Sequence, residues 1–309
     1  MAFTVFIPDF QRSFEAAGRP RLPALERMVA RGVAVKAPAQ AEFLAPLFGL
    51  EPSQLTLAPF MRLADGGGAD GDYRLCAGFV HLAPDRDQLV LMPESLLEVS
   101  SDEIAALAAA FNALYGAEGW ELELAREGRA YLRCPRLLEV VTHEPAVAAG
   151  QAVLDYMPTG PDAVRLKQLM NETQMLFHAH GVNSAREDAG RPLINSLWLW
   201  GGGVLPKADV VTAPQSIMSE LPLVHGLALW AGRTPEPLGI PSDEQETLLA
   251  LAATDPSALE KAWFAPLFAQ LKSGKLKRLR LYLGGFGLLA LDVGAARRFW
   301  RLPRPLAAP

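Results

Sequence analysis

Ile194-Asn-Ser-Leu-Trp-Leu-Trp200, followed at once by Gly201-Gly-Gly203, is the stretch that decides the fold of this chain. Its strand-forming residues carry no charge, a pattern typical of a strand that is buried on both faces of a sheet. Residues 3–7 form a second short run of this kind and end at Pro8-Asp9. Because helical patterns separate the two runs, the sequence predicts an α/β fold whose mixed or parallel sheet contains both strands.

Capping and punctuation residues indicate where helices begin and end. Pro23 opens a helix and Gly32 closes it, which is the usual placement of these two residue types. Ser100 and Glu103 form a capping box, in which each side chain accepts a hydrogen bond from the backbone N–H of the other residue. Further helices are expected at residues 42–48, from residues 159–162 to Gly181, at 217–230 and at 257–271.

Glycine-rich segments divide the chain further. Residues 65–72, Asp-Gly-Gly-Gly-Ala-Asp-Gly-Asp, predict a flexible loop at a domain boundary. After it, paired strands are expected at 73–82 and 88–92, and a hairpin whose turn is Arg126-Glu-Gly-Arg129 completes a small α+β unit. Gly284-Gly285 lies between two further strand patterns and predicts a second hairpin.

The composition excludes several classes of protein. Half of the 309 residues are apolar and a fifth are charged, which is a globular composition. The net charge of −5 argues against a chain that binds nucleic acid with its whole surface. Cys76 and Cys134 make no disulfide framework or structural zinc site, so we expect core thiols in a reduced, cytoplasmic protein. No apolar stretch of about 18 residues predicts a membrane span, and the first ten residues do not resemble a signal peptide, so no membrane partner is expected.

The chain from Lys272 onward is strongly basic. It contains nine basic residues and one acid, so it carries +8, and with −5 overall the rest of the chain carries −13. We favour ion pairing between this segment and the acidic remainder; an anion-binding patch is the alternative. Within it, Arg297-Arg-Phe-Trp-Arg301 suits docking of the C-terminus onto the domain, which we favour, or stacking on nucleic-acid bases.

Three local patterns suggest binding chemistry, and each has a plainer alternative. Asp9, at the end of the first predicted strand, is either a ligand-binding acid or a helix or turn cap. Gly201 to Gly203 either bring backbone N–H groups to a phosphate or form a tight turn, which is the reading we favour. His178 and His180 could hold a metal only if the helix ends before them, and we favour a core position on the apolar stripe for His180.

Four segments, taken in order, resemble part of the archaeal-type, cofactor-independent phosphoglycerate mutases: His180-Gly-Val-Asn183, Arg186, Gly190-Arg-Pro192 and residues 195–203. A more diffuse likeness extends over residues 72–203. The chain is most similar to a bacterial group of that family, the RpfE-type regulatory proteins. The resemblance implies an alkaline-phosphatase-like sheet with helices on both faces and an inserted small α+β domain.

The same resemblance implies domain boundaries and metal chemistry. The core α/β domain would comprise residues 1–60 plus 151–309, and the inserted domain residues 61–150. Members of this family use two divalent metals and a serine nucleophile, and the metals activate the serine and stabilise charge on the transferring phosphoryl group. Asp9 matches the first of their metal ligands.

The chain departs from the family at the catalytic and metal-binding positions. Gln40 stands where the nucleophilic serine is expected, and no histidine follows His225, so the late metal ligands are missing. The arginine-rich segment of the insert is reduced to Asp85-Arg86-Asp87. We therefore expect no catalytic residue, no bound metal and no cofactor, and a non-catalytic binding or regulatory protein. The alternatives are a phosphate-handling enzyme of altered chemistry and a nucleic-acid-associated module that uses the basic C-terminal segment.

The matched motif supplies most of the ligand-binding candidates. Asn183, Arg186 and Asn195 either line a pocket or tie loops to backbone carbonyls, and we favour the structural role. Arg186 is the residue best suited to a small anionic ligand, because a guanidinium binds carboxylate or phosphate through two parallel N–H groups. Otherwise it would pair with an acid such as Glu172 or Asp188. The candidate ligand-binding residues are Asp9, Asn183, Arg186, Asn195, Gly201 and Gly203.

Overall fold

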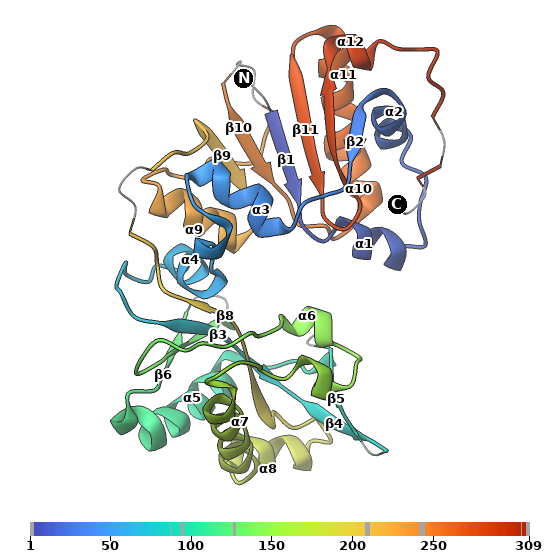
Figure 1. Ribbon diagram of the computed structural model, residues 1–309. Coiled ribbons are helices and arrows are strands. Elements are labelled where there is room, and N and C mark those ends of the chain that lie inside the picture. The colour runs from blue at the N-terminus through green and yellow to red at the C-terminus, as the bar shows by residue number, and fades with distance from the viewer. Residues whose placement is uncertain are drawn as a thin grey trace. The chain divides into compact units, whose positions relative to one another are not determined.

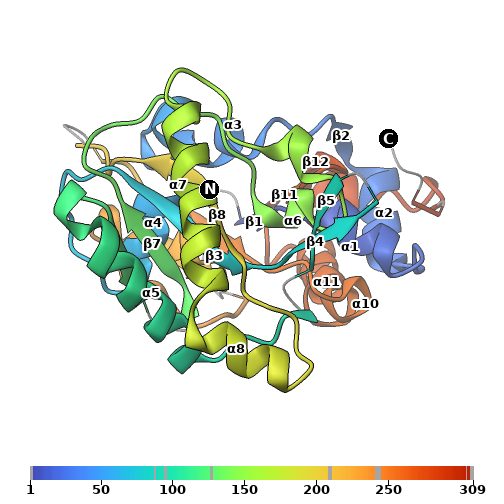
Figure 2. The same cartoon turned by 90° about the horizontal axis from the view of Figure 1, so that it is seen from below.

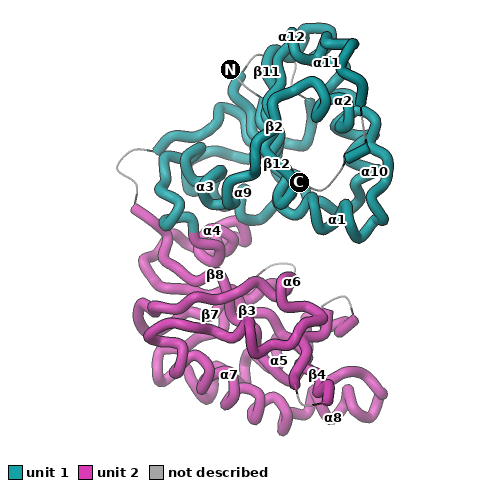
Figure 3. Tube along the Cα trace, turned by 45° about the vertical axis from the view of Figure 1, so that its right-hand side comes forward, with its two compact units in different colours: residues 1–55, 208–309 teal, residues 56–207 magenta. Residues whose placement is uncertain are grey.

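The computed structural model describes residues 3–86, 88–93, 96–125, 128–207, 211–240, 245–303 and 305–306. Internal contacts divide the chain into unit 1, residues 1–55 with 208–309, and unit 2, residues 56–207 (Figure 3). Unit 2 is therefore an insertion between the two segments of unit 1. Within the described residues, no helix is both long and apolar enough to cross a membrane.

Unit 1 is built on a six-stranded mixed sheet. Its strands follow in the order β2 (Val33–Val35), β12 (Gly287–Asp292), β11 (Arg278–Leu283), β1 (Phe3–Ile7), β10 (Thr247–Ala250) and β9 (Ser216–Ser219) (Figure 1). Every residue of β1 is buried, and β1 pairs in parallel with β10 and with β11. β9 extends the parallel part, whereas β12 pairs antiparallel with β11 and with β2.

Helices cover both faces of this sheet. They are α1 (Phe10–Ala16), α2 (Pro23–Arg31), α3 (Gln40–Leu44), α9 (Pro222–Trp230), α10 (Pro256–Leu259), α11 (Ala265–Ser273) and α12 (Val293–Ala296), with a π-helical turn at Glu260–Phe264 and 3₁₀ turns at Ala45–Phe48 and Pro52–Gln54. Phe3, Val5 and Ile7 pack on one face with side chains of α1, α2 and α11. Phe6 points to the opposite face and stacks on Phe43 of α3. The predicted α/β class is therefore confirmed.

Unit 2 is built on a four-stranded antiparallel sheet. The order is β6 (Glu121–Leu124), β7 (Ala130–Arg133), β3 (Arg74–Val80) and β8 (Ser196–Gly203), and β4 (Leu82–Asp85) forms a separate ribbon with β5 (Gln88–Leu91). Its helices are α4 (Leu57–Ala64), α5 (Ser101–Tyr115), α6 (Pro145–Ala148), α7 (Ala163–His178) and α8 (Gly181–Asp188), with 3₁₀ turns at Gly116–Glu118 and Val153–Tyr156. α5 and α7 cover one face of the sheet, where Phe79 stacks on Phe177 (Figure 2).

Several local predictions are confirmed. The backbone N–H of Glu103 donates to Ser100 Oγ at 3.3 Å, and the N–H of Ser100 donates to Glu103 Oε2 at 2.8 Å, which is the predicted capping box. β11 and β12 form the hairpin predicted at Gly284-Gly285. β6 and β7 form the other predicted hairpin, although Arg126 and Glu127 of its turn lie outside the described residues.

The prediction that residues 3–7 and 194–200 share one sheet is wrong. β1 belongs to unit 1, whereas β8 lies at the end of the unit 2 sheet, beside β3. Residues 196–199 are nonetheless buried, because Leu197 and Leu199 face the α5–α7 core and Trp198 packs in a cluster on the other face. An uncharged apolar run therefore reports burial on both faces and not a position inside a sheet.

The inserted unit is wider than the predicted 61–150. α7 supplies Leu166, Leu169 and Phe177 to the core that also holds the inserted strands, and β8 completes their sheet. α4, before the glycine-rich loop, packs on β3 and β8 as well. The division of the chain therefore falls at 55/56 and 207/208.

Three predicted elements differ in detail. α7 ends at His178, and Gly181 begins α8 where a helix stop was predicted. His180 lies between them as the N-cap of α8, with Nδ1 accepting the N–H of Val182 at 3.2 Å. Residues 88–91 pair with β4 and not with β3, and the start of the helix predicted at 217–230 is strand β9. In both cases the apolar run was assigned by composition, which neither separates a short helix from a strand nor names a strand's partner.

Candidate functional site

Asp9 follows β1 at the carboxyl end of the parallel strands. It is the N-cap residue of α1, yet its side chain makes no capping hydrogen bond. The side chain is 62% exposed, and its Oδ1 lies 3.9 Å from a guanidinium nitrogen of Arg12. This is an exposed acid with a long ion pair, and such a pair contributes little to stability.

The residue at the matched nucleophile position, Gln40, is the first residue of α3. Phe43 of that helix stacks on Phe6 and Tyr282, with ring centroids 5.9 Å and 4.6 Å apart. The Tyr282 hydroxyl donates to the backbone carbonyl of Pro38 at 3.0 Å. Burial, with further contributions from Asp9 and Glu42, raises the pKa of Tyr282. The start of α3 is thus held by an aromatic stack and a neutral phenol.

Acids at the ends of neighbouring strands cap backbone groups. Glu220, after β9, accepts the N–H of Ala252 at 3.1 Å, and Asp255 accepts the N–H of Ser257 at 2.8 Å. Among the described residues there is no group of three or more histidine, cysteine, aspartate or glutamate side chains with the geometry to hold a metal ion. Asp9 therefore belongs to no such group, although hard cations take several oxygen ligands.

Asn183 of α8 is buried and ties two segments of the matched motif together. Its Nδ2 donates to the carbonyls of Phe177 and Ile194 at 2.7 and 2.8 Å. Its Oδ1 accepts the N–H of Ile194 at 2.8 Å. The side chain thus joins the end of α7 to the chain that enters β8.

Arg186 is the largest polar side chain in the interior, with 1% of it exposed. Its Nε donates to the carbonyl of Pro192 at 2.6 Å, and the other two nitrogens bind Glu103 at 2.8 Å and the carbonyl of Leu97. The acid it pairs with is Glu103 of the capping box, and not the expected Glu172 or Asp188. All three guanidinium nitrogens are engaged by the protein itself.

Asn195 acts as an additional strand residue. Its Oδ1 accepts the N–H of Leu82 at 2.8 Å, and its Nδ2 donates to the carbonyl of Leu82 at 3.0 Å. Its own N–H donates to Val80 at 3.0 Å. The side chain therefore continues the β3–β8 pairing around the corner into β4.

Gly201 to Gly203 are the last residues of β8 and not the expected tight turn. Between the pairs Cys76–Trp200 and Arg74–Gly203, β8 advances by one residue more than β3, which is a β-bulge. Gly201 has φ +65°. A Cβ at Gly203 would lie 2.2 Å from Thr56 Cγ2. The glycines allow a bulge and a close approach to the start of α4.

The two cysteines occupy the interior of unit 2, as predicted. Burial raises the pKa of the Cys76 thiol far above its ordinary range, and burial raises that of Cys134 to about 12. Both are therefore neutral thiols at physiological pH and poor nucleophiles.

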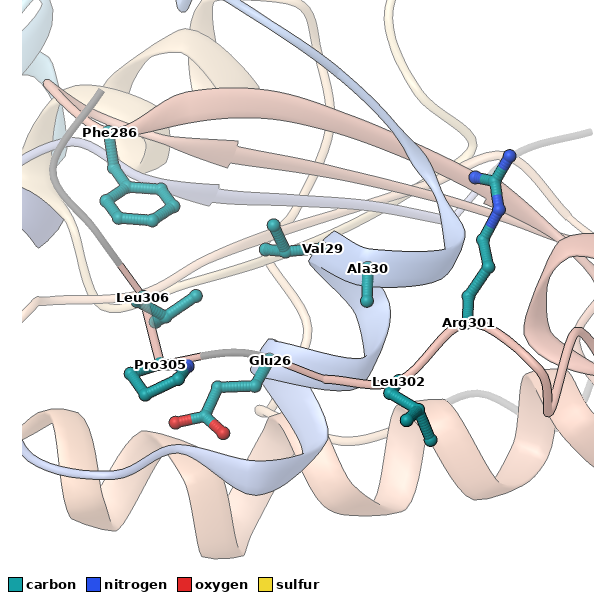
Figure 4. A pocket seen from close by; sticks show the side chains of 8 residues that line it. All are labelled: Glu26, Val29, Ala30, Phe286, Arg301, Leu302, Pro305 and Leu306. Carbon is teal, nitrogen blue, oxygen red and sulfur yellow. The ribbon is translucent and has the colours of Figure 1, made fainter.

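The C-terminal segment lies over α2, where it closes a pocket of about 500 Å³ (Figure 4). Leu306, beyond the stretch for which docking was predicted, packs against the core of unit 1. Glu26, which lines the pocket, forms a two-point ion pair with Arg21 at 2.6 and 2.7 Å. Arg301 points away from the Glu26 carboxylate.

The aromatic pair of this segment does not dock. Phe299 and Trp300 are 76% and 66% exposed, and their rings pack edge to face with centroids 5.3 Å apart. The expectation that this stretch packs onto the domain is therefore wrong for these two side chains. Arg304 and Asp87, two further residues of the segments discussed above, lie outside the described residues.

Sequence reasoning missed a cavity of about 650 Å³ in unit 2. It lies beside β3 where β7 no longer pairs with it, and its lining comes from both faces of the sheet. Cys76, Tyr131 and Trp200 face away from α5 and α7, whereas Phe79 and Ile104 belong to the core under those helices. On the Cys76 face, α4 packs near Cys76 and α6 near Val80, and Gly78 lies between them in β3. A glycine inside a strand was the available signal.

No protein-family model matches the chain. Sequence comparison finds 28% identity over 179 residues with a probable 2,3-bisphosphoglycerate-independent phosphoglycerate mutase of Geobacter sulfurreducens, covering 54% of this chain and 42% of that protein. The mutase of Methanothrix thermoacetophila is 30% identical over 98 residues, covering 30% of this chain and 25% of that protein. The matches thus span less than half the length of these relatives. They confirm the sequence resemblance to cofactor-independent phosphoglycerate mutases, and the narrower likeness to the RpfE-type group stays a prediction.

Two solved structures are similar at lower identity. The cofactor-independent phosphoglycerate mutase of Thermoplasma acidophilum aligns with a TM-score of 0.42 and 17% identity, covering 99% of this chain and 93% of that one. A protein from Pyrococcus horikoshii aligns with a TM-score of 0.47 and 12% identity, covering 94% of this chain and 87% of that one.

Proposed function

We propose that this chain, which is similar in sequence to cofactor-independent phosphoglycerate mutases over about half of its length, is a non-catalytic binding or regulatory protein. The observation that carries the proposal is Gln40, which stands where the resemblance places the nucleophilic serine. An amide cannot be deprotonated to attack phosphorus as an activated hydroxyl does. The aromatic stack of Phe6, Phe43 and Tyr282 holds Gln40 at the start of α3.

The surroundings of Asp9 support the same proposal. Two-metal phosphoryl transfer needs several oxygen and nitrogen ligands around each ion. Asp9 is exposed, and the acids at the neighbouring strand ends, Glu220 and Asp255, accept backbone N–H groups. Among the described residues no group of three or more metal-binding side chains forms, whereas the resemblance implies a cluster.

Regulation or binding would take place in a reducing compartment. Cys76 and Cys134 are both free and buried, which suits the cytoplasm, where thiols stay reduced. We assign the protein to that compartment as part of this proposal.

The test is an assay of 3- to 2-phosphoglycerate conversion with Mn²⁺, Mg²⁺ or Zn²⁺ supplied. We expect no turnover, because removal of the nucleophile from a covalent mechanism costs many powers of ten in rate. Gln40→Ser is the matched variant: it restores a hydroxyl without restoring metal ligands, so it should be equally inactive. Turnover of the unaltered chain above about 1 per second, an ordinary enzyme rate, would contradict the proposal.

Metal content separates this proposal from an enzyme of altered, metal-dependent chemistry. We expect mass spectrometry of the untagged protein to find no stoichiometric divalent metal, because one exposed carboxylate is a weak chelator. Asp9→Ala is the informative variant. A stoichiometric metal in the unaltered chain that is lost in Asp9→Ala would favour the enzyme.

A second candidate function is nucleic-acid association through the C-terminal segment. The observation that favours it is the exposure of Phe299 and Trp300 between Arg298 and Arg301. Exposed rings stack on unpaired bases, and arginines neutralise phosphates. Binding of a single-stranded oligonucleotide that weakens steeply with salt, and that is lost in Trp300→Ala, would support it. Equal oligonucleotide binding by the unaltered chain and the Trp300→Ala variant would contradict this second candidate function.

A further inference from the structure

The cavity beside β3 in unit 2 takes part in none of the chemistry of the matched motif. Its volume of about 650 Å³ lies within the roughly 300–1,000 Å³ typical of small-molecule sites. Its walls include the rings of Tyr131 and Trp200 and the thioethers of Met61 and Met92. Aromatic rings and methionine sulfur both make favourable contacts with another aromatic ring.

Gly78 makes room for the indole that lines the cavity. It lies in β3, where it pairs with Trp198 of β8. A Cβ at this position would lie 3.3 Å from Cζ3 of Trp200, so the indole of Trp200 lies against the bare backbone. The face of an indole suits a planar molecule better than a branched one.

Arg129 is the basic residue among the described lining residues, and it already has an acidic partner. Arg129 Nε donates to Asp65 Oδ2 at 2.8 Å, and the Tyr131 hydroxyl donates to the same oxygen at 2.7 Å. The Asp65 side chain is 3% exposed and that of Arg129 is 30% exposed, so the carboxylate is shielded from water and the guanidinium only in part. Burial raises the pKa of Tyr131, with Asp65 adding to the effect, so the phenol stays neutral. Glu98, at the exposed rim, adds one negative charge.

An anionic ligand would therefore meet an unfavourable site. To bind Arg129 it would have to displace Asp65, and a buried ion pair that loses one partner is strongly destabilised. A charged ligand without a partner would pay the cost of leaving water. A neutral ligand avoids both costs.

We propose that this cavity binds a small, flat, uncharged aromatic molecule, stacked against the indole of Trp200 beside Tyr131. The proposal rests on the proposed binding or regulatory function, for which it names a site and a ligand class. The occupant is held by apolar and ring contacts, while the Arg129–Asp65 pair stays intact at its edge.

The experiment uses N-phenyl-1-naphthylamine, a neutral aromatic dye that fluoresces in apolar sites, with the full chain. We expect saturable one-to-one binding and energy transfer from tryptophan to the dye. Ala146→Phe fills the cavity from α6 and should weaken binding about tenfold or more. Val147→Phe is the matched control: Val147 is the next residue of α6, is exposed and does not line the cavity, so binding should be unchanged.

Three results would overturn the proposal. They are no saturable binding, equal binding by the Ala146→Phe and Val147→Phe variants, or tighter binding of the sulfonated, anionic analogue of the dye. Circular dichroism of both variants shows that each is folded. The mutase assay keeps the two proposals apart: dye binding with mutase turnover contradicts only the non-catalytic function, and absent dye binding without turnover contradicts only the cavity.

Discussion

At the scale of single residues, Arg186 is where a structural and a ligand-binding role differ most clearly. Because the guanidinium is buried and bound to Glu103, Pro192 and Leu97, Arg186→Ala removes the donor from two carbonyls and the shorter of two ion pairs from Glu103. We expect a loss of about 3 kcal/mol or more in the free energy of unfolding, and a melting temperature lower by about 6 °C or more. Thermal unfolding followed by circular dichroism measures both.

Arg191 provides the matched control. It binds the same Glu103 carboxylate at 3.4 Å and the carbonyl of Glu98, but it is exposed. Exposed pairs contribute up to about 1 kcal/mol, so Arg191→Ala should be nearly neutral. An Arg186→Ala variant with unchanged melting that has lost binding of inorganic phosphate would reverse the assignment and return Arg186 to the ligand-binding residues.

The chemistry of the candidate side chains predicted that they would form hydrogen bonds within the protein, but it did not predict which residues they would contact. The structural role favoured for Asn183, Arg186 and Asn195 agrees with their hydrogen bonds, because side-chain amides and guanidiniums commonly bind backbone carbonyls. The acid beside Arg186 was sought nearby in the sequence, yet Glu103 is 83 residues away. The sequence predicted Glu103 only as a capping residue. Its carboxylate both caps α5 and binds Arg186.

At the scale of elements, the end of β8 depends on the absence of side chains. We expect Gly203→Ala to lower the free energy of unfolding by about 1–3 kcal/mol, because the new Cβ would overlap Thr56 at the start of α4. Denaturant unfolding measures the loss. Thr56→Gly removes the overlapping atoms, so the double variant should recover part of it.

Gly181, the first residue of α8, is the control for that variant. Nothing lies within 4 Å of a Cβ at Gly181, and its φ is not positive. Gly181→Ala should therefore be neutral or stabilising by less than about 1 kcal/mol. If Gly203→Ala were equally harmless, the glycines would not be explained by close packing, and a ligand-binding role for the triplet would gain support.

Helix caps and hairpins that depend on neighbouring residues in the sequence were predicted correctly. Features that depend on packing between distant segments were missed. The Ser100 cap and the Gly284-Gly285 hairpin depend on a few neighbouring residues, and both are confirmed. The position of β8 at the end of a sheet depends on β3, more than a hundred residues earlier. The cavity beside β3 depends on where α4, α6 and β7 end, which no single segment encodes.

At the scale of the whole molecule, the insertion is visible in the sequence but its extent is not. The glycine-rich loop at 65–72 suggested a boundary, yet α4 lies before it and packs with the inserted sheet. Composition marks flexible loops, whereas a domain boundary is set by which side chains share a core. For the same reason, the sequence alone could not show which side chains lie close enough to Asp9 to bind a metal ion with it.

Carboxylates bound by arginine predict how stability varies with pH. Burial alone would raise the pKa of Glu123, but hydrogen bonds from Arg74 and Arg62 outweigh it and hold that pKa below the ordinary 4.5. Burial would also raise the pKa of Asp70, but hydrogen bonding to Arg74 outweighs it and lowers that pKa. At Glu103, burial is outweighed by hydrogen bonds from the backbone of Ser100 and from Arg186, so its pKa is lowered too. A carboxyl whose pKa is lowered on folding stabilises the protein above its unfolded pKa. That stabilisation is lost as the pH falls through the folded value.

We therefore expect the free energy of unfolding to be nearly constant from about pH 7 to 5 and to fall steadily below about pH 4.5. Because Glu123, Asp70 and Glu103 all belong to unit 2, the loss should appear first in signals from that unit, such as the fluorescence of its Trp198 and Trp200. Urea unfolding at pH 7, 5 and 3.5 measures the trend. In Glu123→Gln the stability at pH 7 should be lower and its fall with acid shallower, because one titrating group is gone. A protein that became more stable between pH 5 and 3.5 would show that these ion pairs do not govern its acid response.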